Sequence, residues 1–438
     1  MRRQSWYPGR FATAGASYLG YTQWALLDDP PEDCVACAIL AAPHDHARHN
    51  WGTGAFRMDR ITWSDAVVRK QDPAAGGGLL SALSRRLFGP KEDPVDAVLT
   101  GLPVADRVRE YFGDAAPWLP TAMRTPDVDD AHWAPVRHDA ALDRATAPVL
   151  LVGGWYDPFA SQTLEQYARL HARGCSVALT VGPWTHLQAS VLKSMPDVVR
   201  FLDEHVARTA APDGDKTLHR GRAARIYVTG ADEWREMPAW PPATAPRELY
   251  LHGDKSLRSE PPPADAAPSS FTYDPAEPTP TMGGGQLAGG GRVDDSAYAS
   301  RTDLLVFTGG PIDDDVQVLG KPVVQLAHSS DTPFVDLWIR LSEVDSAGVS
   351  HNVCEAFQAL DPQRDPSAPV RLALQDCAHV FRRGTRIRLI VAGGSFPLYA
   401  RNLGTEGNRT AGSEMRPATH TILHAAASTK LLLPVAVD

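Results

Sequence analysis

A serine stands between closely spaced glycines near the start of the chain, in the segment Gly15–Gly20, which reads GASYLG. The segment follows a short apolar run and precedes a helical run that ends near Leu27, the context of a nucleophilic serine on a sharp strand-to-helix turn. Such a turn would present the Ser17 hydroxyl at a helix N-terminus, where the Tyr18 backbone N–H could donate to an oxyanion. Because the short pattern alone is a weak signal, it needs partners elsewhere in the chain.

A serine nucleophile needs a base, and the base needs a carboxylate that orients it. Two later segments supply them in the chain order Ser, Asp, His. Asp157 follows the apolar run Val149–Val152 and precedes a proline, and His186 follows the apolar run Val177–Val181. Each has an ordinary explanation when taken alone, since Asp before Pro is often a turn residue and His near Trp is often packed on a surface. Together they predict a triad of Ser17, Asp157 and His186.

The elements that would position these residues are four short apolar runs, which are predicted strands: Phe11–Ala14, Val35–Ala41, Pro148–Val152 and Val177–Val181. Apolar residues at helical spacing lie between some of them. Alternating strands and helices predict a mostly parallel sheet with helices on its faces. Because the carboxyl ends of parallel strands meet at one edge of a sheet, the three candidate residues would emerge together.

The stretch from about residue 44 to about residue 146 interrupts this alternation with Gly-rich and Pro-rich pieces such as Ala74–Gly78. It also holds short helical patterns at Pro94–Leu99 and Val104–Tyr111. A plain connection is rarely this long. We therefore expect a mainly helical cap, inserted over the edge of the sheet where ligands of open α/β sheets bind.

After about residue 222 the pattern changes to short strands separated by turn residues, with no long helical pattern between them. The predicted strands are Arg225–Thr229, Glu248–Leu251, Leu304–Phe307, Val323–Leu326, Val335–Leu341, Ile387–Val391 and Lys430–Pro434. Such a series is typical of an antiparallel sandwich or jelly roll. The segment Pro261–Arg292 is so rich in Pro and Gly that we expect an irregular crossing there.

The overall composition excludes several classes of protein. A net charge of −9 leaves no basic surplus for a phosphate backbone, so we expect no nucleic-acid partner. No stretch approaches the roughly 20 apolar residues of a membrane helix, and the N-terminus has no apolar signal region, so we expect no membrane partner and a cytoplasmic protein. The pair Cys34 and Cys37 lies in an apolar run, which favours buried thiols over a metal or redox site.

The motifs around the candidate triad resemble those of the CocE/NonD acyl hydrolases, a family related to the X-Pro dipeptidyl-peptidases. The shared motifs of the first half are GASYLGYTQW with its later glycine, GWYDPF and GPWTH, and those of the second half are Tyr273–Ala276, Pro278–Thr281, Gly394–Pro397, Arg401–Leu403 and His420–His424. The resemblance implies an α/β plus all-β protein, in which an α/β-hydrolase domain at 1–222 carries the cap at about 44–146, and a jelly-roll domain of the X-Pro dipeptidyl-peptidase C-terminal type follows at 223–438. By motif match, Ser17 is the nucleophile, Asp157 the acid and His186 the base.

The sequence departs from the family's pattern ahead of the nucleophile. The fold normally has several strands before the elbow, and only one fits before Ser17. The family's second oxyanion donor, a tyrosine hydroxyl from that upstream region, has no counterpart, because Tyr7 is too close to the elbow strand. We therefore expect that the sequence lacks the N-terminal part of the catalytic domain.

Other residues invite weaker interpretations. The run His44-Asp45-His46 follows a predicted strand, and His49 is nearby, but triad hydrolysis needs no metal and we predict none. Asp45 could instead meet an amine of the substrate in a pocket wall. Trp155 and Trp184 lie near the acid and the base, where they would line the acyl pocket or pack against the sheet.

These observations predict a serine hydrolase that cleaves an ester or amide of a small acyl substrate through an acyl-enzyme, without a cofactor. An alternative within enzymes is an X-Pro dipeptidyl-peptidase or an amino-ester or β-lactam acylase, which would use the same triad. An alternative of another class is an inactive fragment that acts as a binding or structural protein. The expected partner is the small-molecule substrate, and a homodimer stays open.

Overall fold

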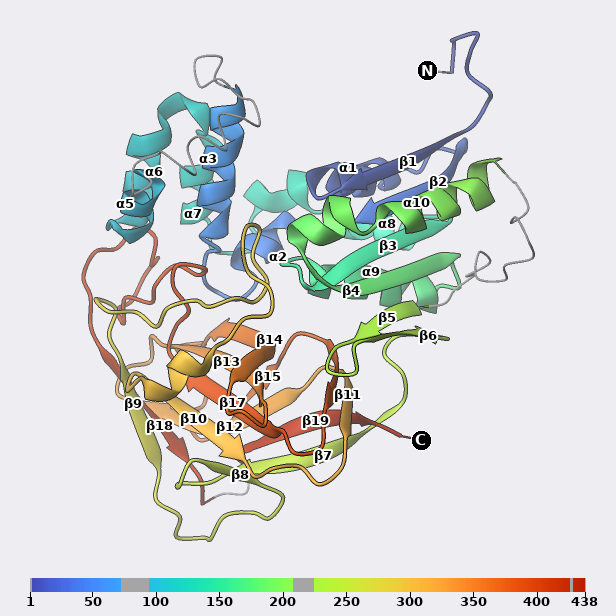
Figure 1. Cartoon of the computed structure of the whole chain (residues 1–438). Coiled ribbons are helices and arrows are strands. Elements are labelled where there is room, and N and C mark those ends of the chain that lie inside the picture. Colours follow the sequence, from blue (N-terminus) through green and yellow to red (C-terminus); the bar gives the residue numbers. More distant parts are fainter. Residues whose placement is uncertain (1, 72–93, 208–223, 426–427, 438) are drawn as a thin grey trace.

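The computed structural model describes residues 2–71, 94–207, 224–425 and 428–437, which form a helical cap, an α/β domain and a β-sandwich (Figure 1). In the view of Figure 1 the cap lies beside the α/β sheet, and the sandwich lies below both. No helix among the described residues is long and apolar enough to cross a membrane.

The α/β domain is built on a six-stranded sheet with the order β1-β2-β3-β4-β5-β6. The first five strands are parallel and β6 is antiparallel to β5. The bounds are β1 Phe11–Ala16, β2 Cys34–Leu40, β3 Val149–Tyr156, β4 Val177–Thr185, β5 Ala224–Val228 and β6 Glu233–Met237. The central strand β3 is buried along its whole length, because helices cover both faces of the sheet.

Two separate cores hold these helices to the sheet. The helices α1 (Tyr18–Leu27), α8 (Asp139–Arg144) and α9 (Ala160–Ala172) pack on one face, where side chains such as Trp24 and Leu151 are buried. The helix α10 (Met195–Leu202) packs on the other face with η4 (Gln188–Leu192) and η5 (Asp203–Ala207). The predicted parallel sheet with helices on its faces is confirmed.

The cap is inserted between β2 and β3. Its helices are α2 His46–Trp51, α3 Asp59–Gln71, α5 Pro94–Thr100, α6 Val104–Phe112 and α7 Trp118–Arg124, with the short turns η2 Gly113–Ala115 and η3 Ala131–Val136. They bury a core of their own. The helices expected at 94–99 and 104–111 are confirmed as α5 and α6, whereas the Gly-rich piece Ala74–Gly78 lies outside the described residues.

The second half forms a large sheet arrangement in which almost every neighbouring pair of strands is antiparallel (Figure 1). Its strands are β7 Thr244–Leu251, β8 Ser256–Arg258, β9 Ser269–Tyr273, β10 Leu304–Gly309, β11 Val316–Gly320, β12 Val323–Ser330, β13 Asp336–Val344, β14 Ser350–Ala359, β15 Val370–Ala373, β16 Cys377–Phe381, β17 Arg386–Ala392, β18 Ala418–Leu423 and β19 Lys430–Ala436. The short turn η8 spans Ser296–Ser300. Aliphatic and aromatic side chains from these strands fill a continuous core, as the predicted sandwich requires.

The structure corrects two predicted elements of this half. The strand expected at Arg225–Thr229 does not belong to the sandwich, because β5 pairs with β4 and buries Ile226 and Val228 in the core of the α/β domain. The segment Pro261–Arg292 is not irregular throughout, because it contains β9, which pairs with β18. The part of it after β9 does cross toward the α/β domain, and it lies close to the loop after β3.

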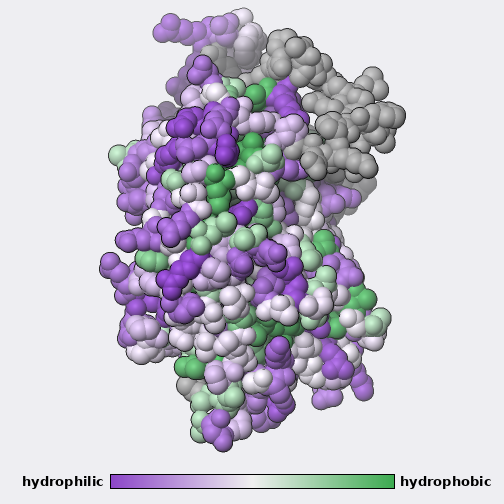
Figure 2. Space-filling model, turned by 90° about the vertical axis from the view of Figure 1, so that its left-hand side faces the viewer, coloured by the Kyte–Doolittle hydropathy of each residue, from purple (hydrophilic) through white to green (hydrophobic). Residues whose placement is uncertain are grey.

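The outer surface is mostly polar on the side that carries the cap. Figure 2 shows this side, where hydrophilic side chains predominate and hydrophobic ones gather in small groups between them.

Candidate active site

Ser17 lies on the sharp turn between β1 and α1. Its backbone has φ 57 and ψ −126, a conformation that costs a non-glycine residue free energy and that persists only where the surroundings impose it. The Ser17 N–H donates to Leu40 O over 2.9 Å, and Ser17 O accepts from Tyr21 N over 2.9 Å, so the turn is held from both sides. The backbone thereby projects the serine side chain at the carboxyl edge of the sheet.

The two glycines of the motif are required by close packing. A Cβ on Gly15 would lie 2.6 Å from Leu19 O, and a Cβ on Gly20 would lie 2.5 Å from the Cβ of Ala42. Real side chains do not approach this closely, so strand, turn and helix meet only because both positions lack a side chain. The later position of the second glycine is explained by its contact with Ala42, which follows β2.

The structure brings the three predicted residues together. His186 follows β4, and its Nε2 lies 3.0 Å from Ser17 Oγ. Its Nδ1 lies 2.8 Å from Oδ1 of Asp157, which follows β3. Asp157 is fully buried, the His186 side chain is 12% exposed, and Ser17 is half-buried, so the carboxylate is shielded while the serine can be reached from outside. This is the geometry that lets an imidazole accept a proton from a serine hydroxyl.

The loop that carries Asp157 is held by contacts from both domains. Its backbone N–H donates to Gly154 O, and its carbonyl accepts from Ala160 N at the start of α9. The crossing segment of the second half packs against it, because a Cβ on Gly285 would lie 3.3 Å from Asp157 O. Arg57 of the cap donates to Gly285 O over 2.8 Å. The sandwich and the cap therefore share in positioning the acid.

Tyr18 is the first residue of α1, and its backbone N–H is one of the donors that a helix N-terminus leaves without an intrahelical acceptor. Tyr7 does not lie at this end of the sheet. Its hydroxyl donates to Asp33, the residue before β2, and Arg2 bonds to the same carboxylate. The expectation that Tyr7 is no substitute for a second oxyanion donor agrees with this position.

Three residues that we considered as pocket residues take part in helix capping and core packing. Asp45 is fully buried, accepts from Arg48 N as the N-cap of α2, and lies 3.3 Å from Arg137 Nε, so its carboxylate is not free to meet a substrate amine. Trp155 donates to Tyr227 O and packs on Trp240 in the core.

Trp184 packs over Gly182, where a Cβ would lie 2.3 Å from its ring atoms, and against Trp234. For Trp155 and Trp184 the structure has the alternative given above, packing against the sheet, while the Asp45 carboxylate is occupied by helix capping and by Arg137.

The three histidines after β2 point to different neighbours. His44 Nδ1 lies 3.2 Å from Gln166, and its Nε2 lies 3.5 Å from Asp139, with Glu165 close by. Arg48 binds Glu165 through the two terminal nitrogens of its guanidinium, so an ion-pair network already holds this group. His46 and His49 turn elsewhere, and among the described residues these histidines do not converge on one point.

Several residues at the site were missed by the sequence reasoning. The ring of Phe159 stands edge-on to His186, with 5.4 Å between centroids, and His49 lies 4.6 Å beyond it. Tyr21 contacts His46 at 4.4 Å, and its hydroxyl is 2.9 Å from His138 Nε2. Tyr21 is one helical turn after Ser17, a spacing that would have placed it at the site.

Burial sets the charge states of these neighbours. Burial is the main cause that lowers the pKa of His46 and of His49 well below the usual value, so both imidazoles are neutral at pH 7. Burial also raises the pKa of Tyr21 to about 12, so its hydroxyl stays protonated. These three side chains are therefore uncharged at pH 7.

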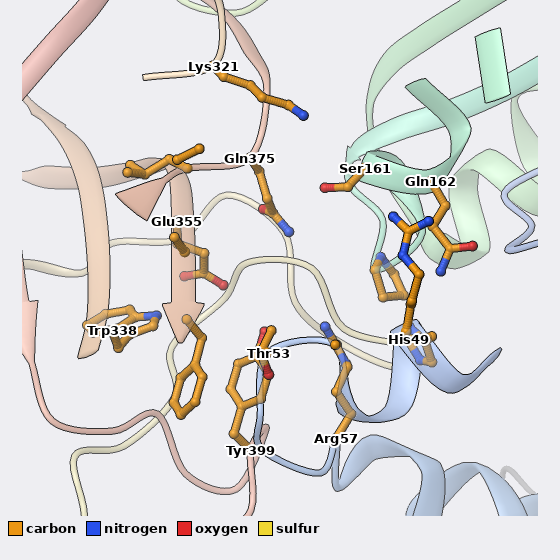
Figure 3. Close-up of a pocket in the computed structure, with 17 residues that line it drawn as sticks. His49, Thr53, Arg57, Ser161, Gln162, Lys321, Trp338, Glu355, Gln375 and Tyr399 are labelled. Carbon is orange, nitrogen blue, oxygen red and sulfur yellow. The ribbon is translucent and has the colours of Figure 1, made fainter. Parts of the chain in front are cut away.

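A cavity of about 290 Å³ lies on the other side of the acid loop, between α2, the start of α9 and the sandwich (Figure 3). Figure 3 shows Glu355 and Gln375 reaching into it from the sandwich, opposite Ser161. His49 lines this cavity, whereas Ser17 does not.

Comparisons with known proteins agree with this fold. Residues 1–188 match the family model described as X-Pro dipeptidyl-peptidase (S15 family), and residues 219–433 match that of the X-Pro dipeptidyl-peptidase C-terminal non-catalytic domain. The two matches together cover most of the chain, which is therefore similar to this family in both of its halves. The predicted resemblance to the CocE/NonD acyl hydrolases is confirmed, and the second half corresponds to the non-catalytic domain of the S15 family.

Individual relatives show the same two-domain architecture. The chain is 26% identical to cocaine esterase of Rhodococcus sp. (strain MB1 Bresler) over 92% of its own length and 76% of that protein. Its structure matches an aminopeptidase from a marine sediment archaeon (Thaumarchaeota archaeon) with a TM-score of 0.79 at 22% identity, over 100% of this chain and 78% of the other. It matches an α-amino acid ester hydrolase with a TM-score of 0.76 at 21% identity, over 98% and 77%. The chain thus spans about three quarters of each relative.

Proposed function

We propose that the chain hydrolyses an ester or amide bond of a small acyl substrate through an acyl-enzyme on Ser17. The observation that carries this proposal is the pair of distances at His186, 3.0 Å from Nε2 to Ser17 Oγ and 2.8 Å from Nδ1 to Asp157 Oδ1. A serine hydroxyl, a base and a buried carboxylate in line are what acyl transfer needs.

Each group has one role in the proposed reaction. His186 Nε2 accepts the Ser17 proton as Oγ forms a bond to the acyl carbon, and the backbone N–H of Tyr18 donates to the oxyanion. His186 then gives that proton to the leaving oxygen or nitrogen as the scissile bond breaks. A water molecule, deprotonated by the same imidazole, attacks the acyl-enzyme, releases the acid and restores the serine. Asp157 keeps the ring oriented and stabilises its protonated form.

The activities of the relatives support this class of reaction, since an esterase, an aminopeptidase and an α-amino acid ester hydrolase all act on acyl bonds. We favour an acyl ester or amide without a free amine. The carboxylate that could have gripped an amine, Asp45, caps α2 and pairs with Arg137. Relative rates on para-nitrophenyl acyl esters and on Ala-Pro anilides separate this proposal from dipeptidyl-peptidase activity.

Labelling with a fluorophosphonate probe tests the proposal, because the probe reacts with an activated serine. We expect one labelled site in the intact protein and none in Ser17→Ala. The exposed Ser5 offers a matched control, and Ser5→Ala should label like the parent. A well-folded parent chain that takes up no probe would instead favour a binding or structural protein.

A further inference from the structure

Arg60, in the first turn of the cap helix α3, is a buried cation without a counter-ion among the described residues. It is 9% exposed, and its Nε is fully enclosed with no hydrogen-bond partner. In the described part of the chain its guanidinium makes no hydrogen bond and no ion pair, although the carboxylate of Asp59 is near enough for its charge to raise the pKa of Arg60 against the effect of burial. Buried arginines normally have such partners, because an unpaired charge in the interior is costly.

The neighbouring arginines show what Arg60 lacks. Arg57 binds Asp59 through two nitrogens and also donates to Gly285 O. Arg48 binds Glu165 in the same bidentate way. The nearest carboxylate in sequence, that of Asp59, is therefore already used by Arg57. Burial lowers the pKa of Arg60 to about 10, which still leaves it protonated at pH 7.

The Arg60 guanidinium lies over the rings of two tryptophans. Its central carbon lies 4.7 Å from the ring centroid of Trp63 and 5.6 Å from that of Trp118. Such cation–π contacts stabilise the charge. They do not replace hydrogen-bond acceptors, and the N–H donors of Arg60 have none among the described residues. A planar fork of donors matches the two oxygens of a carboxylate.

Arg60 also belongs to the surroundings of the candidate active site. Its charge acts on Tyr21, His46 and His49, where it adds to the effects of burial on the two histidines. Tyr21 is bonded through its backbone to the carbonyl of Ser17, and its ring contacts His46.

A second neighbour of Arg60, His49, leads toward the base. His49 contacts Phe159, which contacts His186. Arg60 thus lies in the cap, near residues that contact the turn of the nucleophile and the neighbours of the base.

We propose that Arg60 binds a carboxylate of the substrate, so that the hydrolase acts on anionic acyl esters or amides. The inference rests on the proposed function of Ser17. The carboxylate belongs either to the acyl part, as in a half-ester of a dicarboxylic acid, or to the leaving group. Either would complete the ion pair that the folded chain leaves open, and the substrate would be oriented over Ser17 by this second contact.

Substrate pairs test the proposal in the unmodified protein. One arm compares the para-nitrophenyl half-esters of succinate, glutarate and adipate with neutral para-nitrophenyl esters of matched length, after subtraction of the spontaneous rates. The other arm compares para-butanoyloxybenzoate with its methyl ester. We expect kcat/KM for the charged member to be about 10- to 100-fold higher in one arm, because a charge-assisted pair is formed. Equal values in both arms would overturn the proposal, without any variant being needed.

Variants of Arg60 test whether this residue causes the preference for charged substrates. Arg60→Met should remove most of the ratio between charged and neutral substrates, and Arg60→Lys should keep part of it, since the charge stays but the fork is lost. Arg107→Met is the matched control, because Arg107 is half-exposed on α6 and pairs with Glu110. A ratio that survives in folded Arg60→Met would contradict the role.

Direct binding separates this inference from the proposed function. Calorimetry with glutarate on Ser17→Ala should show binding that is lost in Ser17→Ala/Arg60→Met and weakened by added salt. If the parent chain binds glutarate through Arg60 but takes up no fluorophosphonate, the proposed anion site stands and the proposed hydrolysis is contradicted. If the chain is labelled by the probe but neither binds glutarate nor prefers charged esters, only the proposed anion site is contradicted.

Discussion

Asp157 and His186 come from the loops after two adjacent parallel strands, and the carboxylate Oδ1 lies 2.8 Å from the imidazole Nδ1. The carboxylate is fully buried, whereas the other ring nitrogen faces Ser17. The pair fixes which nitrogen carries the proton, and this determines whether the ring can serve as a base.

Replacing Asp157 with asparagine should therefore impair catalysis with little change in packing. We expect kcat to fall by about 10,000-fold, because the amide favours the wrong tautomer of His186. Steady-state kinetics together with thermal unfolding would check this. The exposed Asp29 provides the control, and Asp29→Asn should retain full activity. A kcat for Asp157→Asn within tenfold of the parent would contradict the role of the acid.

Gly20 is predicted to tolerate no side chain. In Gly20→Ala the new Cβ would lie 2.5 Å from that of Ala42, so the elbow must shift. We expect a loss of about 1–3 kcal/mol in the free energy of unfolding, as for other overpacked sites, and a lower kcat. At Gly310 a Cβ would meet nothing within 4 Å, so Gly310→Ala should change the unfolding free energy by less than about 0.5 kcal/mol. Denaturant unfolding measures both.

The contact between cap and crossing segment should also matter for the acid loop. Arg57→Ala would leave the buried carboxylate of Asp59 without its partner, which should cost about 3–5 kcal/mol of stability, and it would release Gly285, which packs on Asp157. We expect lower kcat along with lower stability. The exposed pair of Arg258 and Asp254 is the comparison, and Arg258→Ala should cost less than about 1 kcal/mol with normal kcat.

Two histidines in the sandwich should make the stability depend on pH. Burial lowers the pKa of His328 to about 4 and that of His420 to about 3. Both are neutral in the folded chain, whereas the unfolded chain takes up protons below about pH 6.5. Their contribution is therefore fully present above pH 6.5 and is lost as the pH falls toward 4, by about 1.4 kcal/mol per pH unit for each residue.

Urea unfolding between pH 7 and pH 5 would show this slope. His420→Asn should reduce the slope by the contribution of about one proton. His132 is exposed, so His132→Asn should leave the slope unchanged. A slope that is the same in His420→Asn as in the parent would show that this histidine takes up its proton equally in the folded and unfolded states, and would contradict the prediction.

Much of the candidate site could be predicted from the sequence. Ser17, Asp157 and His186 each follow an apolar run, and the topology of parallel strands alone brings such residues to one edge. The cap was predictable from the length of the insertion. The strand Ala224–Val228 was assigned to the wrong half because its alternating pattern suits either sheet, and only the pairing with β4 decides between them.

The direction in which individual side chains point could not be predicted from the sequence. Trp155 and Trp184 are close in sequence to the acid and the base, and the sequence left open whether they line a pocket or pack against the sheet. In the structure Trp155 packs on Trp240, and Trp184 packs over Gly182, which has no side chain. Asp45 is used by a helix N-terminus, a local role that competes with binding. Arg60 has no sequence motif, because its burial depends on two tryptophans brought together by the fold of the cap.

The central claim is that Ser17 forms a covalent acyl intermediate. The most direct measurement is to quench the chain during turnover of a para-nitrophenyl ester, digest it, and locate the added acyl mass by peptide mass spectrometry. We expect the mass on the peptide that contains Ser17, together with a burst of one nitrophenolate per chain, and neither in Ser17→Ala. Turnover that continues in Ser17→Ala, or an acyl group found only on another residue, would contradict the account.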